Sequence, residues 1–124
     1  MHITRVAKDE EREDGIHMEI IVDAYGPEEQ FTGWYNYLYE TLQFPFSAQC
    51  VARRVISPLT PGDKVEVMDI APEEECHHEM FVLIKWKSYQ FAVPLMQLEG
   101  IQADEATQQA IEDWRYWVQR GYEF

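Results

Sequence analysis

The feature that most constrains the fold is a change in the spacing of apolar residues along the chain. Towards both ends apolar side chains recur every three or four residues, and between them lie short segments rich in β-branched residues. Helices that flank a run of short strands are typical of an α+β domain. Because 124 residues is the size of one ordinary domain, we expect a single domain spanning residues 1–124.

The first clear helix is predicted to begin at Pro27, because proline is tolerated at the first helical position and the acidic residues after it suit the helix dipole. Pro45 ends this helix, since the residue before a proline disfavours helical geometry. Apolar residues at helical spacing form its buried stripe: Phe31, Trp34, Tyr35, Leu38 and Leu42.

The segment before this helix fits two patterns. Residues 8–14 are a charge run that is either a solvated helix or a frayed lead-in to the domain. Between Ile16 and Tyr25, apolar residues alternate as in a strand but also fit one side of a helix. We favour the helix, because the acidic run before it suits a helix.

Strands are predicted at residues 48–56, 64–70 and 80–87, with a further short segment at 91–93. Two prolines and a glycine break the pattern at 57–63. This spacing predicts a small curled antiparallel sheet, for which an SH3-like barrel would fit.

A closing helix is the clearest element. Asp104 is a good N-cap and Gly121 a natural stop. Its predicted buried face comprises Ala106, Ala110, Ile111, Trp114 and Val118.

The charge of the chain excludes some partners and favours others. Ten Lys and Arg against 23 Asp and Glu give a formal charge of −13, which would repel nucleic acid and attract divalent cations or a basic protein. No apolar run approaches the roughly 20 residues that cross a bilayer, and the N-terminus does not resemble a secretory signal. We therefore expect a cytoplasmic protein with no nucleic-acid or membrane partner.

Acidic residues gather in three places. Asp23, Glu28 and Glu29 surround the turn into the first clear helix, where capping is the ordinary role. Glu29, Asn36 and Glu40 lie seven and four residues apart, so they follow one helix face. Such a ridge of oxygens is either a solvated face or a set of ligands for a hard cation.

The third place is the run Glu73, Glu74 and Glu75 between two predicted strands. Adjacent carboxylates repel one another unless they are solvated or neutralised, and Ca²⁺ accepts about six to eight oxygens in flexible geometry. The spacing of an EF-hand loop does not occur in the chain.

The sequence also has to be examined for zinc binding and for catalysis. Cys76 and His78, completed by Cys50, offer soft ligands for zinc, although cysteines in a reducing compartment are otherwise free thiols. The chain contains no Gly-x-Ser-x-Gly elbow, phosphate-binding loop or His-Glu-x-x-His motif. We therefore do not expect an enzyme.

Several segments, in order from about residue 10 to the C-terminus, resemble the bacterial calcium-binding protein family typified by the calcium-binding protein of heterocyst-forming cyanobacteria. They are IVDAYGPEE at 21–29, GWY at 33–35, FPF at 44–46, ISPL at 56–59, MDIAPEEEC at 68–76, AVPL at 92–95, EDWRYW at 112–117 and GYEF at 121–124.

The resemblance implies a small, acidic, bowl-like α+β domain that binds calcium outside any EF-hand and buffers or sequesters it in the cytoplasm. It also implies ligands near the aromatic helix. One position departs from the family pattern, because Leu38 is followed by Tyr39 and Glu40 where the family has two acidic residues. That change is expected to weaken a site there, or to shift its weight to Asp23 and the triple-Glu run.

Taken together, the residues and the resemblance predict a non-enzymatic protein whose ligand is Ca²⁺. The expected oxygen donors are Asp23, Glu29, Glu40, Glu73, Glu74 and Glu75. The alternatives are an acidic interaction domain that docks on a basic protein partner, and a small zinc-binding protein.

Overall fold

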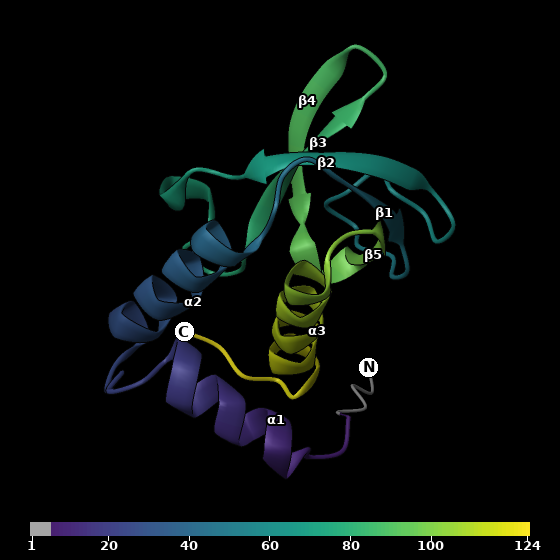
Figure 1. Cartoon of the computed structure of the whole chain (residues 1–124). Helices are drawn as coiled ribbons and strands as arrows, with labels where there is room; N and C mark the ends of the chain where they lie inside the picture. The colour runs from purple at the N-terminus through teal and green to yellow at the C-terminus, as the bar shows by residue number, and fades with distance from the viewer. Residues whose placement is uncertain (1–5) are drawn as a thin grey trace.

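A computed structural model describes residues 6–124 as helices packed beside one antiparallel sheet (Figure 1). The α+β prediction is confirmed. In order the elements are α1 (Glu10–Gly15), η1 (Ile16–Ile20), α2 (Pro27–Thr41), β1 (Phe46–Cys50), β2 (Lys64–Ile70), η2 (Glu73–Glu75), β3 (Phe81–Trp86), β4 (Tyr89–Pro94), η3 (Leu95–Gln97), β5 (Leu98–Gln102) and α3 (Glu105–Gln119).

Residues 1–5 lie outside the described residues. The start of the expected domain and the N-terminus, where no secretory signal is expected, fall within them. Within residues 6–124, no helix combines the length and the apolar character needed to cross a membrane.

The sheet is curled but open. Its five strands follow the order β4-β3-β2-β1-β5, and all neighbouring pairs are antiparallel. Only the three residues of η3 separate the two edge strands in sequence, so the sheet has to curl. Among the described residues β4 and β5 do not pair with each other. The prediction of a small curled antiparallel sheet is confirmed, and the described residues do not form a fully closed barrel, because closure requires that pairing.

The first strand is shorter than predicted, because the chain leaves the sheet after Cys50. Val55 and Ile56, which have high β propensity, lie exposed in a loop. Arg54 anchors this loop by donating two hydrogen bonds to the Glu79 carboxylate, at 2.6 and 2.8 Å. Tertiary contacts thus override the local preference for a strand.

The sequence pattern also missed β5. Glu99, Gly100 and Gln102 interrupt any apolar alternation there. The strand forms because it pairs with β1 along one side and α3 contacts it. Edge strands of this kind need less apolar sequence than central ones.

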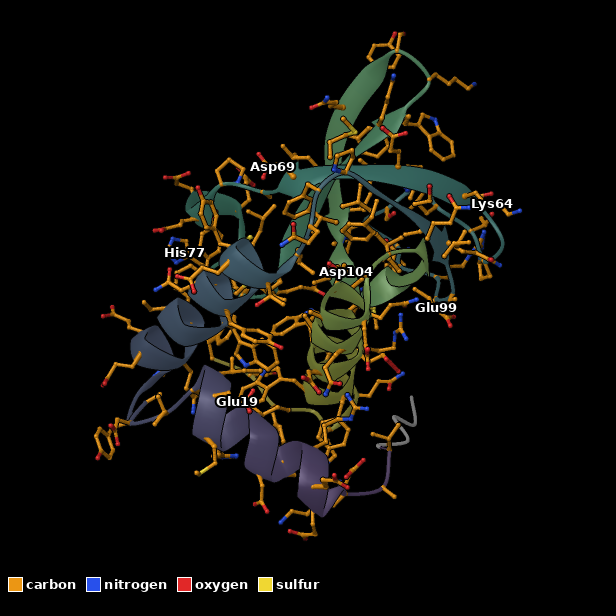
Figure 2. All side chains as sticks on the ribbon, in the orientation of Figure 1. Glu19, Lys64, Asp69, His77, Glu99 and Asp104 are labelled. Atoms are coloured by element: carbon orange, nitrogen blue, oxygen red, sulfur yellow. The ribbon has the colours of Figure 1, made fainter. Side chains whose placement is uncertain are left out.

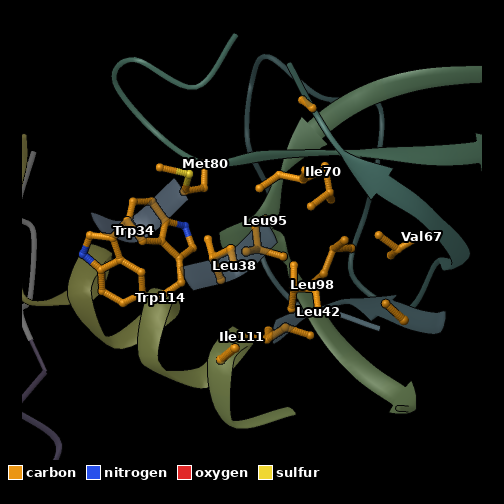
Figure 3. Packing of buried hydrophobic residues seen from close by; sticks show 14 of the residues in the cluster. Trp34, Leu38, Leu42, Val67, Ile70, Met80, Leu95, Leu98, Ile111 and Trp114 are labelled. Atoms are coloured by element: carbon orange, nitrogen blue, oxygen red, sulfur yellow. The ribbon is translucent and has the colours of Figure 1, made fainter. Parts of the chain in front are cut away.

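The predicted helical stripes form the core between the helices and the sheet (Figure 3). Trp34 on α2 meets Trp114 on α3 edge to face, with ring centroids 5.0 Å apart. One position on α3 was predicted wrongly: Ala106 is exposed and Thr107 is buried instead. Thr107 is buried because its hydroxyl accepts a hydrogen bond from the Gln43 amide, 3.0 Å away, just beyond the end of α2.

The N-terminal segment is helical as far as Ile20, so the helical alternative for residues 16–25 is right for its first half. Asp9 caps α1 by accepting a hydrogen bond from the Arg12 amide at 3.0 Å. The charge run is not fully solvated, because Glu13 is buried. Its carboxylate accepts hydrogen bonds from the hydroxyls of Tyr116 and Tyr122, each at 2.7 Å, and these bonds join α1 to α3.

Candidate functional site

A pocket of about 580 Å³ lies between α2 and the segment that leads into it. Three of the predicted ligands, Asp23, Glu29 and Glu40, line this pocket together. Two further carboxylates, Glu19 and Glu28, also line it. We call this set of five carboxylates and the space between them the α2 pocket.

One wall of the α2 pocket is the polar face of α2. Gly26 precedes the helix in an extended conformation and Pro27 occupies its first turn, so the helix begins where the sequence predicted. Glu29, Asn36 and Glu40 then follow one side of the helix and are exposed, whereas Trp34 and Leu38 are fully buried. The regular helical period thus separates the core stripe from the site.

The other wall is the connection from η1 to α2. Ile20 and Ile21 are buried and hold this connection against the core. Asp23 then adopts a left-handed backbone conformation, with φ of 56°. Aspartate is among the few residues that tolerate this conformation, and unusual backbone of this kind clusters at ligand sites. The π-helical turn at Ile16–Ile20 is a second irregularity of the same type.

Among residues 6–124, the lining of the α2 pocket has no positive counter-charge. No Lys or Arg side chain of these residues lines it. Within residues 6–124 the ion pairs involve other carboxylates, such as those of Asp113, Glu79 and Glu13. Asn36 and Thr32 add neutral oxygens to the lining. The pocket therefore offers only hard oxygen donors to a cation.

The carboxylates are neighbours without being a preassembled metal centre. In the part of the chain that the structure describes, no three His, Cys, Asp or Glu side chains are close enough together to hold a metal ion. A metal would have to draw the exposed side chains inward or complete its shell with water. Ca²⁺ suits such a set, because its coordination number and geometry are flexible.

The triple-Glu run lies elsewhere. Glu73–Glu75 form η2, whose side chains are exposed and do not line the α2 pocket. The Tyr35 hydroxyl donates a hydrogen bond to the Ala71 carbonyl oxygen at 2.8 Å, which holds this loop against the far side of α2. In Figure 2, Asp69 and His77 lie near this loop, whereas Glu19 lies near α1. The structure thus divides the six predicted ligands into two groups of three.

The loop carboxylates act on Tyr35. Burial is the largest cause that raises the pKa of Tyr35, to about 12, and the negative charges of Glu73, Asp69 and Glu74 add to it. Tyr39 stacks on Tyr35 with ring centroids 6.4 Å apart. Tyr39 does not line the α2 pocket, although the neighbouring Glu40 does.

The zinc alternative has no support among the described residues. Cys50 and Cys76 are both free and buried. The Cys50 thiol contacts the Gln97 amide, whereas the Cys76 sulfur accepts a hydrogen bond from the Phe81 amide at 3.4 Å. Burial raises the pKa of the Cys76 thiol, which disfavours the thiolate that zinc binds. No group of three ligands converges on either cysteine in the described residues.

Two lining carboxylates were missed at the sequence level. Glu28 was assigned only a capping role, although Glu28, Thr32, Asn36 and Glu40 recur every fourth residue and so share a helix face. That spacing was a usable signal. No pattern in the sequence indicated Glu19, because its position depends on how η1 ends and how the chain then turns towards α2.

Comparisons with known proteins identify the family of the chain. A family model described as calcium binding, and named for CcbP, matches residues 14–118. A search of curated proteins found no match. The crystal structure of Anabaena CcbP is 41% identical, with a TM-score of 0.83, over 96% of this chain and 98% of that chain.

A second solved structure, described as a calcium-binding protein in the calcium-binding form, is 40% identical over 94% of this chain and 96% of its own, with a TM-score of 0.82. The family match covers most of the chain, and the structural likeness covers 96% of it. The chain belongs to the CcbP family of calcium-binding proteins.

Proposed function

We propose that this chain binds Ca²⁺ in the α2 pocket, with Asp23, Glu29 and Glu40 as the principal oxygen donors. Glu19 and Glu28 supply further oxygens from the two walls. The observation that carries the proposal is the gathering of five carboxylates in one lining to which no Lys or Arg of the described residues contributes. Like charges held together in this way repel one another, and a doubly charged ion relieves that repulsion.

The chemistry of the α2 pocket favours calcium over magnesium. Its carboxylates are exposed and come from a helix face and a turn, so they can adjust to a large ion with about six to eight ligands. Magnesium demands near-ideal octahedral geometry and gives up its water reluctantly. An adaptable set of side chains therefore gains more from calcium.

The proposed site is not an EF-hand. Its donors come from α2 and from the connection before it, rather than from a single 12-residue loop between two helices. We further propose that the protein buffers or sequesters calcium in the cytoplasm. The open position of the pocket and the absence of catalytic motifs from the sequence support this role.

Glu73, Glu74 and Glu75 have a secondary role in this proposal. They do not line the α2 pocket, so they act through the negative field of the domain rather than as ligands there. Their effect on calcium binding should fall as the ionic strength rises, because salt screens exposed charges.

Calorimetric titration at near-physiological ionic strength tests the proposal. Saturable binding of Ca²⁺, much weaker binding of Mg²⁺, and a loss of about tenfold in Ca²⁺ affinity in Glu40→Gln are expected, which corresponds to about 1.4 kcal/mol. Calcium at about a hundredfold excess over its dissociation constant should also raise the free energy of unfolding by about 2.7 kcal/mol. Equal responses to both ions, or an unchanged affinity in Glu40→Gln, would contradict the assignment.

A further inference from the structure

Gly33 lies in the middle of α2 and lines the α2 pocket. A glycine inside a helix costs about 1 kcal/mol relative to alanine, because it loses more backbone freedom on folding. The stability of α2 alone therefore does not explain a glycine at this position. The explanation is the close approach of the backbone of Ile20 and Ile21.

A side chain at Gly33 would collide with the backbone of the preceding segment. A Cβ atom there would lie 2.4 Å from the Ile20 carbonyl oxygen, 3.4 Å from the Ile20 carbonyl carbon and 3.5 Å from the Ile21 Cα. Real Cβ contacts essentially never approach 2.4 Å. Because the obstructing atoms belong to the backbone of two buried residues, they cannot rotate away as a flexible side chain would.

This contact is where the two walls of the α2 pocket meet. The end of η1 rests directly on the backbone of α2, and the chain reaches Asp23 two residues after Ile21. Glu29 and Glu40 stand on the opposite wall, on either side of Gly33 along α2. The separation of the walls at Gly33 therefore sets how near Asp23 can come to the carboxylates of the helix.

We infer that Gly33 is a positioning residue for the calcium site, which holds the Asp23 wall within reach of Glu29 and Glu40. The inference rests on the proposed function, since it specifies how that site is assembled. Gly33 supplies no ligand itself. It acts by leaving room for the Ile20 carbonyl.

Two other glycines provide matched controls. A Cβ atom on Gly15 or on Gly26 would meet nothing within 4 Å. Both glycines flank the same segment, and neither lines the α2 pocket. Gly15→Ala and Gly26→Ala therefore introduce the same methyl group without displacing a wall.

The test is calcium titration of Gly33→Ala beside these two controls, well below the unfolding temperature of each calcium-free variant. We expect the affinity for Ca²⁺ to fall by about tenfold or more in Gly33→Ala and to stay within about twofold of the unsubstituted protein in the controls. A merely structural role would lower the unfolding temperature without changing the affinity of the folded protein. Unchanged affinity in folded Gly33→Ala would overturn the inference and leave the calcium site standing.

A second measurement needs no substitution. In the unsubstituted protein, NMR should show a nuclear Overhauser effect between the α-protons of Gly33 and Ile21, both without calcium and with it. Loss of this contact in the calcium-loaded protein would overturn the inference even if Gly33→Ala failed to fold. If the unsubstituted protein bound no calcium at all, the proposed function would fail first, and the inference with it.

Discussion

Carboxylates gather in two parts of the molecule, and they differ in whether the chain supplies partners for them. The first is the contact between α1 and α3, which we call the α1–α3 contact. There Glu13 accepts hydrogen bonds from Tyr116 and Tyr122, and the Arg12 guanidinium lies 2.6 Å from the Asp113 carboxylate. In the α2 pocket, by contrast, none of the lining residues that the structure describes has a cationic side chain.

The difference shows how one residue type serves structure or binding. In the α1–α3 contact the chain supplies its own donors, so the carboxylates are buried and join two helices. In the α2 pocket the carboxylates remain exposed, and under the proposed function an external ion relieves their repulsion. Internal pairing is thus what separates a structural acid from a candidate ligand in this protein.

The largest expected effect comes from removing the centre of the α1–α3 contact. Glu13→Ala should lower the free energy of unfolding by about 2 kcal/mol, because it leaves two tyrosine hydroxyls without their acceptor. Urea denaturation measures this loss. Glu40→Ala is the matched control and should change the calcium-free stability by less than about 0.5 kcal/mol. Equal losses in the two variants would remove the distinction between the regions.

A second substitution would give the carboxylates of the α2 pocket a cation from the chain itself, as Arg12 does for Asp113 in the α1–α3 contact. Asn36→Lys places an ammonium group among the lining carboxylates, with Glu40 one helical turn away. We expect the affinity for Ca²⁺ to fall by about tenfold, or about 1.4 kcal/mol, because the lysine competes for the same oxygens. The calcium-free protein should gain about 0.5 kcal/mol. Asn36→Gln is the neutral control, and a similar loss of affinity in it would show that charge is not the cause.

Acid should weaken the α1–α3 contact through Glu13. Burial opposes the charged form, but the hydrogen bonds from Tyr116 and Tyr122 prevail and lower the pKa of Glu13 below its ordinary 4.5. A lowered carboxyl pKa contributes stability that is fully present above pH 4.5 and is lost as the pH falls through the folded-state pKa. The effect should be smaller than that of Glu13→Ala, because a protonated carboxyl keeps part of its hydrogen bonding.

The free energy of unfolding of the unsubstituted protein and of Glu13→Gln, measured by denaturation between pH 6 and pH 3, checks this loss of stability below the ordinary pKa of 4.5. The variant should lose less stability in acid than the unsubstituted protein. Asp113 works the other way, since burial raises its pKa despite the nearby Arg12, and protonation therefore relieves a cost. An acid response that is identical in both proteins would assign the pH dependence to other groups.

The smallest effect is expected at η2. Glu74→Gln removes one exposed charge from outside the α2 pocket, so the affinity for Ca²⁺ at about 0.15 M salt should change by less than about twofold. The same titration at low salt should enlarge the difference. A loss as great as that of Glu40→Gln would instead make η2 part of the calcium site.

The sequence predicted those parts of the site that depend on a regular period. The positions of Glu29, Asn36 and Glu40 follow from the spacing of α2, whose apolar stripe is unambiguous. Glu19 and the backbone conformation of Asp23 depend on a π-helical turn that no apolar pattern announces. The place of the triple-Glu run depends on the bond between Tyr35 and Ala71, which joins residues 36 positions apart.

The fold shows the same division. The stripes of α2 and α3 predicted the core because each helix spans several turns. The loop after Cys50 and the strand β5 were missed because side-chain pairing and sheet register decide them, and neither is local in sequence. Regular elements were thus readable from the sequence, whereas their ends and edges were not.

Within the described part of the chain, the residues that line the α2 pocket all lie between Glu19 and Glu40, so the proposed site is encoded by one uninterrupted stretch. The sheet and α3 support this stretch without contributing to its lining. A redesign of ion preference can therefore be confined to the polar face of this stretch. Its apolar face has to stay as it is, because Trp34 and Leu38 belong to the core that is shared with α3 and the sheet.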